Sequence, residues 1–202
     1  MRYVSIDIET TGLDPQACQI LEFGAVIDDL TGLDAEPTPV EKLPTFHAYI
    51  DNRHVTGGLG CLVNLPYVYG DPYALSMHPK ILRRIATHEE GFTYLETKEL
   101  PIEFMEWCRL HDIDEVIPAG KNYGPFDHQF LKLLPGWAEE VNMTHRSIDP
   151  SMLWITPEDE VPPSLSVCLE RAGYDPNVAH TAVEDALDVV RVVREGLRRQ
   201  WK

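Results

Sequence analysis

The sequence predicts one domain of the α/β or α+β class, in which helices pack on a β-sheet. Segments with the composition of strands dominate the first 50 residues, and segments with helical spacing of apolar residues dominate after residue 100. The chain has 202 residues, of which 44% are hydrophobic, so it can bury one sizeable core. We find neither an internal repeat nor a linker, and we therefore expect residues 1–202 to form a single domain.

The first half of the chain predicts a hairpin followed by a third strand. Residues 3–8 and 20–27 have strand character, and a turn rich in Thr, Gly, Asp and Pro at 10–15 joins them. A third strand is predicted at 46–50. Segment 51–79 is rich in Gly, Pro and Tyr and has no clean period, so we expect an irregular insertion or lid there.

The second half predicts helices interrupted by two short strands. Apolar residues recur at helical spacing, and Gly173 provides a natural helix stop. The expected order is helix 101–110, strand 115–119, helix 125–134, strand 145–149, helix 164–172 and helix 181–200.

The chain is strongly acidic. It contains 17 Lys and Arg residues against 33 Asp and Glu residues, which gives a formal net charge of −16. A protein that coats phosphates nonspecifically is excluded, because the mean field of this chain repels nucleic acid and anionic lipid. A polyanion must therefore be bound locally, by a basic patch or by bound cations.

Membrane and secretory classes are not expected either. The longest uncharged run, 55–70, is broken by glycines and by Pro66, which excludes a membrane-spanning helix. The first residues run directly into a strand pattern, so no signal peptide is predicted. The four cysteines lie far apart, without the paired spacing of a zinc or redox site, so we expect reduced thiols in a cytoplasmic protein.

Asp7 and Glu9 are the first candidate functional residues. They are two positions apart on a predicted strand, so both carboxylates lie on one face. Two such charges repel by roughly 4 kcal/mol at about 4 Å and an effective dielectric near 20. Either this is a solvated edge strand with two surface acids, or a cation lies between them. Oxygen ligands of this kind favour Mg²⁺ or Mn²⁺.

Asp127, His180 and Asp185 are further candidates at two helix starts. An acid at the position of Asp127, in the first turn of its helix, also has an ordinary explanation, because it complements the helix dipole. Thr181 and Glu184 have the spacing of a capping box, so His180 lies in the loop just outside the last helix. Asp185 falls on the edge of the apolar stripe of that helix, which is unusual unless a positive group meets it.

The remaining polar positions there have ordinary explanations. Asp188 lies farther round the same helix, and we expect it to be solvated. The simpler alternative for His180 is a loop histidine that caps a backbone carbonyl.

Together these residues resemble the DEDDh family of 3′→5′ exonucleases. The three motifs of the family occur in order: Asp-Ile-Glu-Thr-Thr-Gly at 7–12, then Asn122 followed by Phe126-Asp127 and Phe130-Leu131, then His180 followed after four residues by Asp185. The step from Asn122 to Asp127 and the segment 146–151 resemble the oligoribonuclease branch of this family.

The resemblance implies a fold and a metal site. The fold would be ribonuclease-H-like, with a mixed sheet of about five strands and helices on both faces. The four acids would hold two divalent cations, Mg²⁺ or Mn²⁺: Asp7 would bridge them, Glu9 and Asp185 would complete the water-activating one, and Asp127 would support the second through waters. His180 would take the proton of the attacking water.

The resemblance also implies the substrate and its contacts. The substrate would be single-stranded RNA or DNA, cleaved from the 3′ end to nucleoside 5′-monophosphates. Contacts are expected from Asn122 and from the turn after the first strand, where the Thr10, Thr11 and Gly12 backbone meets the terminal sugar. Leu13 would wedge against the last base, or it packs in the hairpin. Many relatives are homodimers, which leaves a homodimer open beside a monomer.

Two rival functions remain open at this stage. One is a module that binds nucleic-acid 3′ ends without turnover, although all five catalytic residue types are present. The other is a metal-dependent phosphatase of small phosphoesters, although no phosphate-cradling glycine loop accompanies the acids. The sequence leaves the choice between RNA and DNA open.

Overall fold

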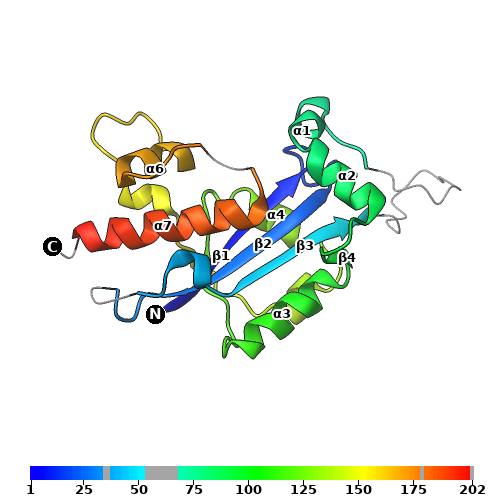
Figure 1. The fold of residues 1–202 in the computed structure, drawn as a ribbon, viewed down its shortest axis with the longest axis horizontal. Helices are drawn as coiled ribbons and strands as arrows, with labels where there is room; N and C mark the ends of the chain where they lie inside the picture. Colours follow the sequence, from blue (N-terminus) through cyan, green and yellow to red (C-terminus); the bar gives the residue numbers. More distant parts are fainter. Residues whose placement is uncertain (34–36, 53–67, 178–179, 201–202) are drawn as a thin grey trace, which may run out of the picture.

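A mixed five-stranded sheet forms the centre of the molecule (Figure 1). The computed structural model describes residues 1–33, 37–52, 68–177 and 180–200. The strand order is β4-β3-β2-β1-β5; β1 pairs antiparallel with β2, and β2 antiparallel with β3, whereas β1–β5 and β3–β4 are parallel pairs. The strands are β1 (Arg2–Thr10), β2 (Ile20–Asp29), β3 (Thr45–Asp51), β4 (Tyr94–Glu96) and β5 (Pro118–Ala119).

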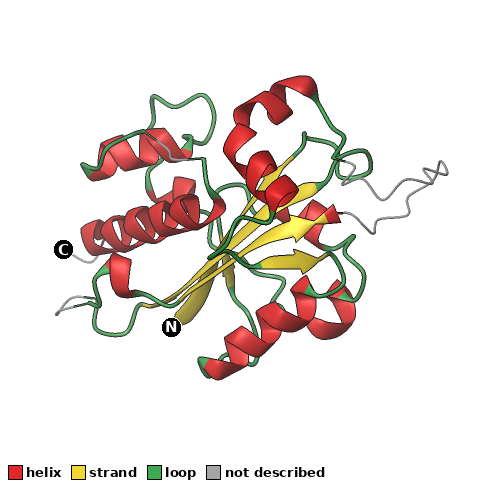
Figure 2. Ribbon diagram, turned by 45° about the vertical axis from the view of Figure 1, so that its right-hand side comes forward, coloured by secondary structure: helices red, strands yellow, loops and turns green. Residues whose placement is uncertain are grey.

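Helices cover both faces of the sheet (Figure 2). The long helix α7 packs on the face of β1 and β2 that carries Tyr3 and Val26, and α3 packs on the opposite face, against residues such as Phe23. The described α-helices are α1 (Pro72–Met77), α2 (Pro79–Thr87), α3 (Leu100–Leu110), α4 (Asp127–Leu131), α5 (Trp137–Glu140), α6 (Leu165–Ala172) and α7 (Ala182–Gln200), with short 3₁₀ helices η1 (Val40–Lys42) and η3 (Pro150–Leu153).

The alternation of β1 divides its residues between two cores. Val4, Ile6 and Ile8 point into the core shared with α3. Tyr3 points into the core shared with α7. Because side chains alternate along a strand, Asp7 and Glu9 lie on the α7 face, as their spacing predicts. The hairpin of β1 and β2 and the third strand are confirmed.

The predicted strand at 145–149 is wrong. Ile148 makes only an isolated bridge to Ala119. Asp149 accepts a hydrogen bond from the backbone N–H of Ser151, and Pro150 then begins η3, so the chain turns where the strand was expected to continue. Strand 115–119 is likewise shorter than predicted, since β5 contains only Pro118 and Ala119.

The predicted helix at 125–134 is also shorter, because α4 contains five residues. Its flanks are tight turns, in which Phe126 donates to the Asn122 carbonyl and Leu134 donates to the Leu131 carbonyl. Asp127 is therefore the first residue of α4, as expected of an acid in a first turn.

Strand β4 and helix α2 are missing from the sequence prediction. The predicted irregular segment, 51–79, includes helix α1 within its described part, and residues 53–67 lie outside the described residues. Asp188 is not solvated as expected: it is buried and pairs with Arg191.

The predictions on membrane-spanning helices and on cysteines can also be compared with the structure. No helix in the described ranges is long and apolar enough to cross a membrane. Cys18, Cys108 and Cys168 are free thiols, as expected, and Cys61 lies outside the described residues.

Candidate active site

The site begins with Asp7 and Glu9 near the carboxyl end of β1. In the ladder with β2, Asp7 lies opposite Gly24 and Glu9 lies opposite Glu22. Both acids are partly buried. The alternative of two solvated surface acids does not apply, because both side chains are partly buried, and β1 is paired with β2 along both of these positions.

Gly24 lets the start of α7 approach the sheet. A Cβ atom built on Gly24 would lie 2.3 Å from the carbonyl carbon of Ala182, the first residue of α7. Only glycine therefore permits this contact between strand and helix. Since Gly24 lies beside Asp7, the close approach brings the first turn of α7, with Asp185, over the β1 acids.

Asp7, Glu9 and Asp185 form one carboxylate cluster. One oxygen from each lies within 4.8 Å of the others. Asp185 is buried, and its Oδ1 atom has no hydrogen-bond partner in the described part of the chain. Three clustered oxygen donors with an orphaned buried atom fit a hard divalent cation, whose charge would offset the mutual repulsion.

Burial, together with the neighbouring acids, raises the pKa of every carboxyl in the cluster. Burial, followed by the charges of Asp127 and Asp185, raises the pKa of Asp7 well above its ordinary range. Burial, followed by Asp185 and Glu22, raises the pKa of Glu9 to about 8. Burial, followed by Asp188 and Glu22, raises the pKa of Asp185 to about 7. A bound cation favours the ionised carboxylates, so it would lower these pKa values.

Asp127 lies beside this cluster and is anchored to β1. It is buried, and one of its carboxylate oxygens accepts a hydrogen bond of 3.2 Å from the backbone N–H of Ile8. Burial raises the pKa of Asp127 to about 7. After burial, the charge of Asp127 is the next cause of the raised pKa of Asp7, so Asp127 lies near the cluster. It is not one of the three acids whose oxygens lie within 4.8 Å of one another.

Glu22 is a buried acid beside the cluster that the sequence reasoning missed. It is 2% exposed, and its carboxylate contacts the His47 ring at 2.6 Å and accepts a 3.3 Å hydrogen bond from the backbone N–H of Ala182. Glu22 thus ties β2 to the first residue of α7. The one available sequence signal was a charged residue within a strand of mostly apolar residues. Alternation of polar and apolar residues could not distinguish it, because all residues of β2 except the last are buried.

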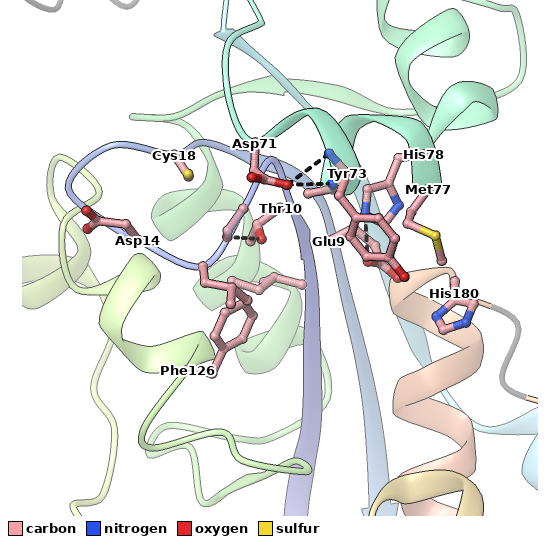
Figure 3. Close-up of a pocket in the computed structure, with 14 residues that line it drawn as sticks. Glu9, Thr10, Asp14, Cys18, Asp71, Tyr73, Met77, His78, Phe126 and His180 are labelled. Carbon is pink, nitrogen blue, oxygen red and sulfur yellow. Dashed lines mark hydrogen bonds and ion pairs between the residues drawn. The ribbon is translucent and has the colours of Figure 1, made fainter.

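A cavity of about 590 Å³ opens beside the cluster. It is lined by Glu9, by the turn after β1, by residues of α1, and by Phe126 and His180. Figure 3 shows His180 at the start of α7, with Tyr73, Met77 and His78 on the facing side of the cavity. His180 lines the cavity, is exposed, and lies two residues before the first residue of α7 with a left-handed backbone (φ 51°).

Three of the five predicted substrate contacts line this cavity: Thr10, Gly12 and Leu13. Leu13 is 84% exposed, so the alternative of hairpin packing is wrong for this side chain. Thr11 is buried, and its hydroxyl accepts from the N–H of Gln19, which stabilises the turn.

Asn122 is not among the lining residues. It is exposed, and its side-chain oxygen accepts from the Lys121 ammonium. Its backbone N–H donates to Asp149, and its carbonyl accepts from Phe126. In this structure Asn122 shapes the turn before α4, and its contact with substrate stays a prediction.

Similar solved structures extend over nearly the whole chain. Exonuclease I from Methylocaldum szegediense matches with a TM-score of 0.65 and 18% identity, over 100% of this chain and 41% of that one. The zinc-bound form of an E. coli exonuclease I complex with single-stranded DNA matches with a TM-score of 0.63 and 14% identity, over 100% and 41%. Cell-death related nuclease 4 (CRN-4) matches with a TM-score of 0.63 and 12% identity, over 98% and 64%.

The chain has a ribonuclease-H-like fold. The predicted architecture, a mixed sheet of five strands with helices on both faces, is thereby confirmed. This ribonuclease-H-like chain spans about two fifths of the length of exonuclease I and 64% of CRN-4. Neither a protein-family model nor a curated protein sequence matches it. At 12–18% identity, the likeness establishes the fold.

Proposed function

We propose that this protein is a metal-dependent 3′→5′ exonuclease of the DEDDh type, which hydrolyses single-stranded nucleic acid to nucleoside 5′-monophosphates. The observation that carries the proposal is the cluster of Asp7, Glu9 and Asp185, with its orphaned Asp185 oxygen at the edge of a large cavity. The fold shared with exonuclease I and CRN-4 supports it.

The acids would hold the cofactor. Asp7, Glu9 and Asp185 would be ligands of one divalent cation, and Asp127, at the start of α4, would support a second one. Mg²⁺ and Mn²⁺ suit carboxylate oxygens. Such ions, when bound, lower the pKa of a water and neutralise charge on the phosphate and the leaving oxygen.

His180 would be the general base. It lies outside α7 and lines the same cavity as Glu9, so it borders the space in which the substrate and the attacking water would lie. The alternative, a histidine that only caps a backbone carbonyl, would not need this position at the cavity.

The cavity would receive the 3′-terminal nucleotide. Thr10 and Gly12 offer backbone groups to the sugar, and exposed Leu13 offers an apolar surface to the last base. In the similar E. coli structure the bound nucleic acid is single-stranded DNA, which favours DNA as the first substrate to test. RNA stays an equal part of the proposal, as does the likeness to the oligoribonuclease branch.

Three finer predictions accompany this function. The free thiols of Cys18, Cys108 and Cys168 support a cytoplasmic location. Organisation of residues 1–202 as one domain and assembly into a homodimer stay predictions.

The test uses 5′-labelled single-stranded DNA and RNA of equal sequence and graded length, incubated with Mg²⁺, Mn²⁺ or EDTA. We expect a ladder that shortens from the 3′ end, requires metal and is lost, by at least about 10³-fold, in Asp7→Ala. Glu103→Ala, which changes an exposed acid on α3, is the matched control and should retain activity.

Two other outcomes would overturn the proposal. Folded, metal-bound protein that binds oligonucleotides but cleaves none would be a 3′-end-binding module. Hydrolysis of an aryl phosphate in preference to every oligonucleotide would identify a phosphatase.

A further inference from the structure

We propose that His78 is a positioning residue of the metal site, which holds the Glu9 carboxylate toward Asp7 and Asp185. This inference rests on the proposed function and adds to it a second histidine. No motif in the sequence assigns a role in catalysis or metal binding to His78.

The first observation is the contact itself. Nε2 of His78 lies 3.5 Å from Oε2 of Glu9, and both side chains are largely buried, at 9% and 12% exposure. Three acids surround Glu9 and repel its charge: Asp7 and Asp185 lie in its cluster, and Glu22 lies opposite it on β2. An N–H donor is the group that counters this repulsion and selects one orientation of the Glu9 carboxylate.

The second observation is the other ring nitrogen. Nδ1 of His78 is buried and has no hydrogen-bond partner among the residues that the structure describes. A purely structural buried histidine satisfies both nitrogens in most proteins. His78 also lines the cavity beside the cluster, as His180 does, so the ring belongs to the site and not to the core (Figure 3).

The backbone around His78 makes it a rigid support. The residue closes α1, where its N–H donates to the Leu75 carbonyl, and opens α2, where its carbonyl accepts from the N–H of Leu82. Helix α2 is fixed to the sheet in turn, because Ile81 and Ile85 pack against Leu21 of β2 and Tyr49 of β3. The ring of His78 is therefore tied to the same sheet that carries Glu9.

The expected consequence concerns metal affinity. A ring N–H that contacts a ligating carboxylate orients the lone pairs that face the ion, and loss of such a partner typically weakens metal binding by about 10- to 100-fold. Apolar packing alone has no such effect, so a variant that keeps the volume of the ring but lacks its donor separates the two roles.

The experiment measures Mn²⁺ binding to the full chain without nucleic acid, by titration calorimetry and by the loss of the free Mn²⁺ electron-spin resonance signal, at one fixed pH. His78→Leu should raise the Kd for Mn²⁺ by about 10-fold, and His78→Gln, which retains an N–H donor, should stay within about 3-fold of the unchanged protein. Circular dichroism establishes that each variant is folded.

His88→Leu is the matched control. His88 follows the last residue of α2, its ring lies 3.2 Å from the carboxylate of Asp51, and it is not among the residues that line the cavity. The substitution therefore removes a histidine–carboxylate contact that lies away from the cluster. Its Kd for Mn²⁺ should not change. The Mg²⁺ concentration for half-maximal nuclease activity should follow the same order among the variants, at unchanged KM for the oligonucleotide.

The failures of the two proposals are distinguishable. If the unchanged protein binds no Mn²⁺, the proposed function fails and the role of His78 fails with it. If the unchanged protein binds Mn²⁺ and degrades oligonucleotides, but His78→Leu binds Mn²⁺ equally well, only the role of His78 is wrong. Equal weakening in the Leu and Gln variants would likewise reduce His78 to a packing residue.

Discussion

The floor and the rim of the candidate site are built from different kinds of structure. The floor is the carboxylate cluster, carried by the nine-residue strand β1 and the nineteen-residue helix α7. The rim is the turn after β1 together with α1, a helix of six residues. Floor residues belong to elements that pack in two cores, whereas the rim residues Leu13 and Tyr73 are 84% and 74% exposed.

This difference separates chemistry from recognition. Like-charged carboxylates can be held close together only where the backbone is fixed by packing, since they would otherwise move apart. Contacts with a substrate need exposure, and exposed side chains on short elements change at little cost in stability. Three predictions test this contrast.

The largest effect is expected where the floor is assembled. Gly24→Ala places a Cβ atom 2.3 Å from the Ala182 backbone, so α7 must move away from β2 and carry Asp185 with it. We expect a loss of about 3 kcal/mol in the free energy of unfolding, measured with urea, and a larger loss of activity than the stability change explains.

Gly124→Ala is the control for this substitution, because a Cβ atom there meets nothing within 4 Å. It should change stability by less than about 0.5 kcal/mol. Equal effects of the two substitutions would show that the close approach at Gly24 does not position α7.

A second, smaller effect concerns pH and metal removal. The folded-state pKa values of Glu9, about 8, and of Asp127 and Asp185, about 7, lie above those of the unfolded chain. The metal-free folded protein therefore holds protons that the unfolded chain releases, and its stability falls as pH rises from about 4 to 8. In EDTA we therefore expect Tm to fall over this range, as measured by thermal unfolding at a series of pH values.

Mg²⁺ should reverse this trend. Cations bind the ionised carboxylates of the folded state, so their stabilising effect should be small at pH 5 and largest at pH 8. Asp7→Asn, which removes one acid from the floor, should flatten the profile in EDTA. Parallel Tm curves with and without Mg²⁺ would contradict a metal site at these residues.

The smallest effect is expected at the rim. Leu13→Ala and Tyr73→Ala should each raise KM for an oligonucleotide by about 10-fold, since an apolar or aromatic contact with a base contributes roughly 1–3 kcal/mol. Neither should change the free energy of unfolding by more than about 0.5 kcal/mol. Leu110→Ala, at a side chain of 81% exposure on α3, is the control and should leave KM unchanged.

Local patterns were sufficient to place the acids of the floor on their strand and helix faces, whereas the resemblance to an exonuclease family was needed to select them as a set. The two-residue spacing of Asp7 and Glu9 determines their common face in any strand, and Asp185 lies where the helical period predicts an inward-facing position. The structure agrees in both cases. The same reasoning placed Asp188 in solvent, which is wrong, because α7 is also covered on the side that carries the Asp188–Arg191 pair.

Partners from distant elements were beyond these patterns. Glu22 lies in a strand buried on both faces, so no periodicity distinguishes it from its apolar neighbours. His78 lies between two short helices in a segment without a clean period. The importance of each residue is visible only from its tertiary contact, which is with Ala182 for Glu22 and with Glu9 for His78.

By itself, the sequence determined the class of fold, the hairpin and which acids share a face, because each of these depends on repeats of two to four residues along the chain. The tertiary structure decided how near those acids come to one another. That distance depends on Gly24, which has no side chain to keep α7 away from the sheet, and on Glu22, which binds the first N–H of the helix. Contacts over 160 positions of sequence, such as that between Glu22 and Ala182, carry no local signal and arise only when the elements pack.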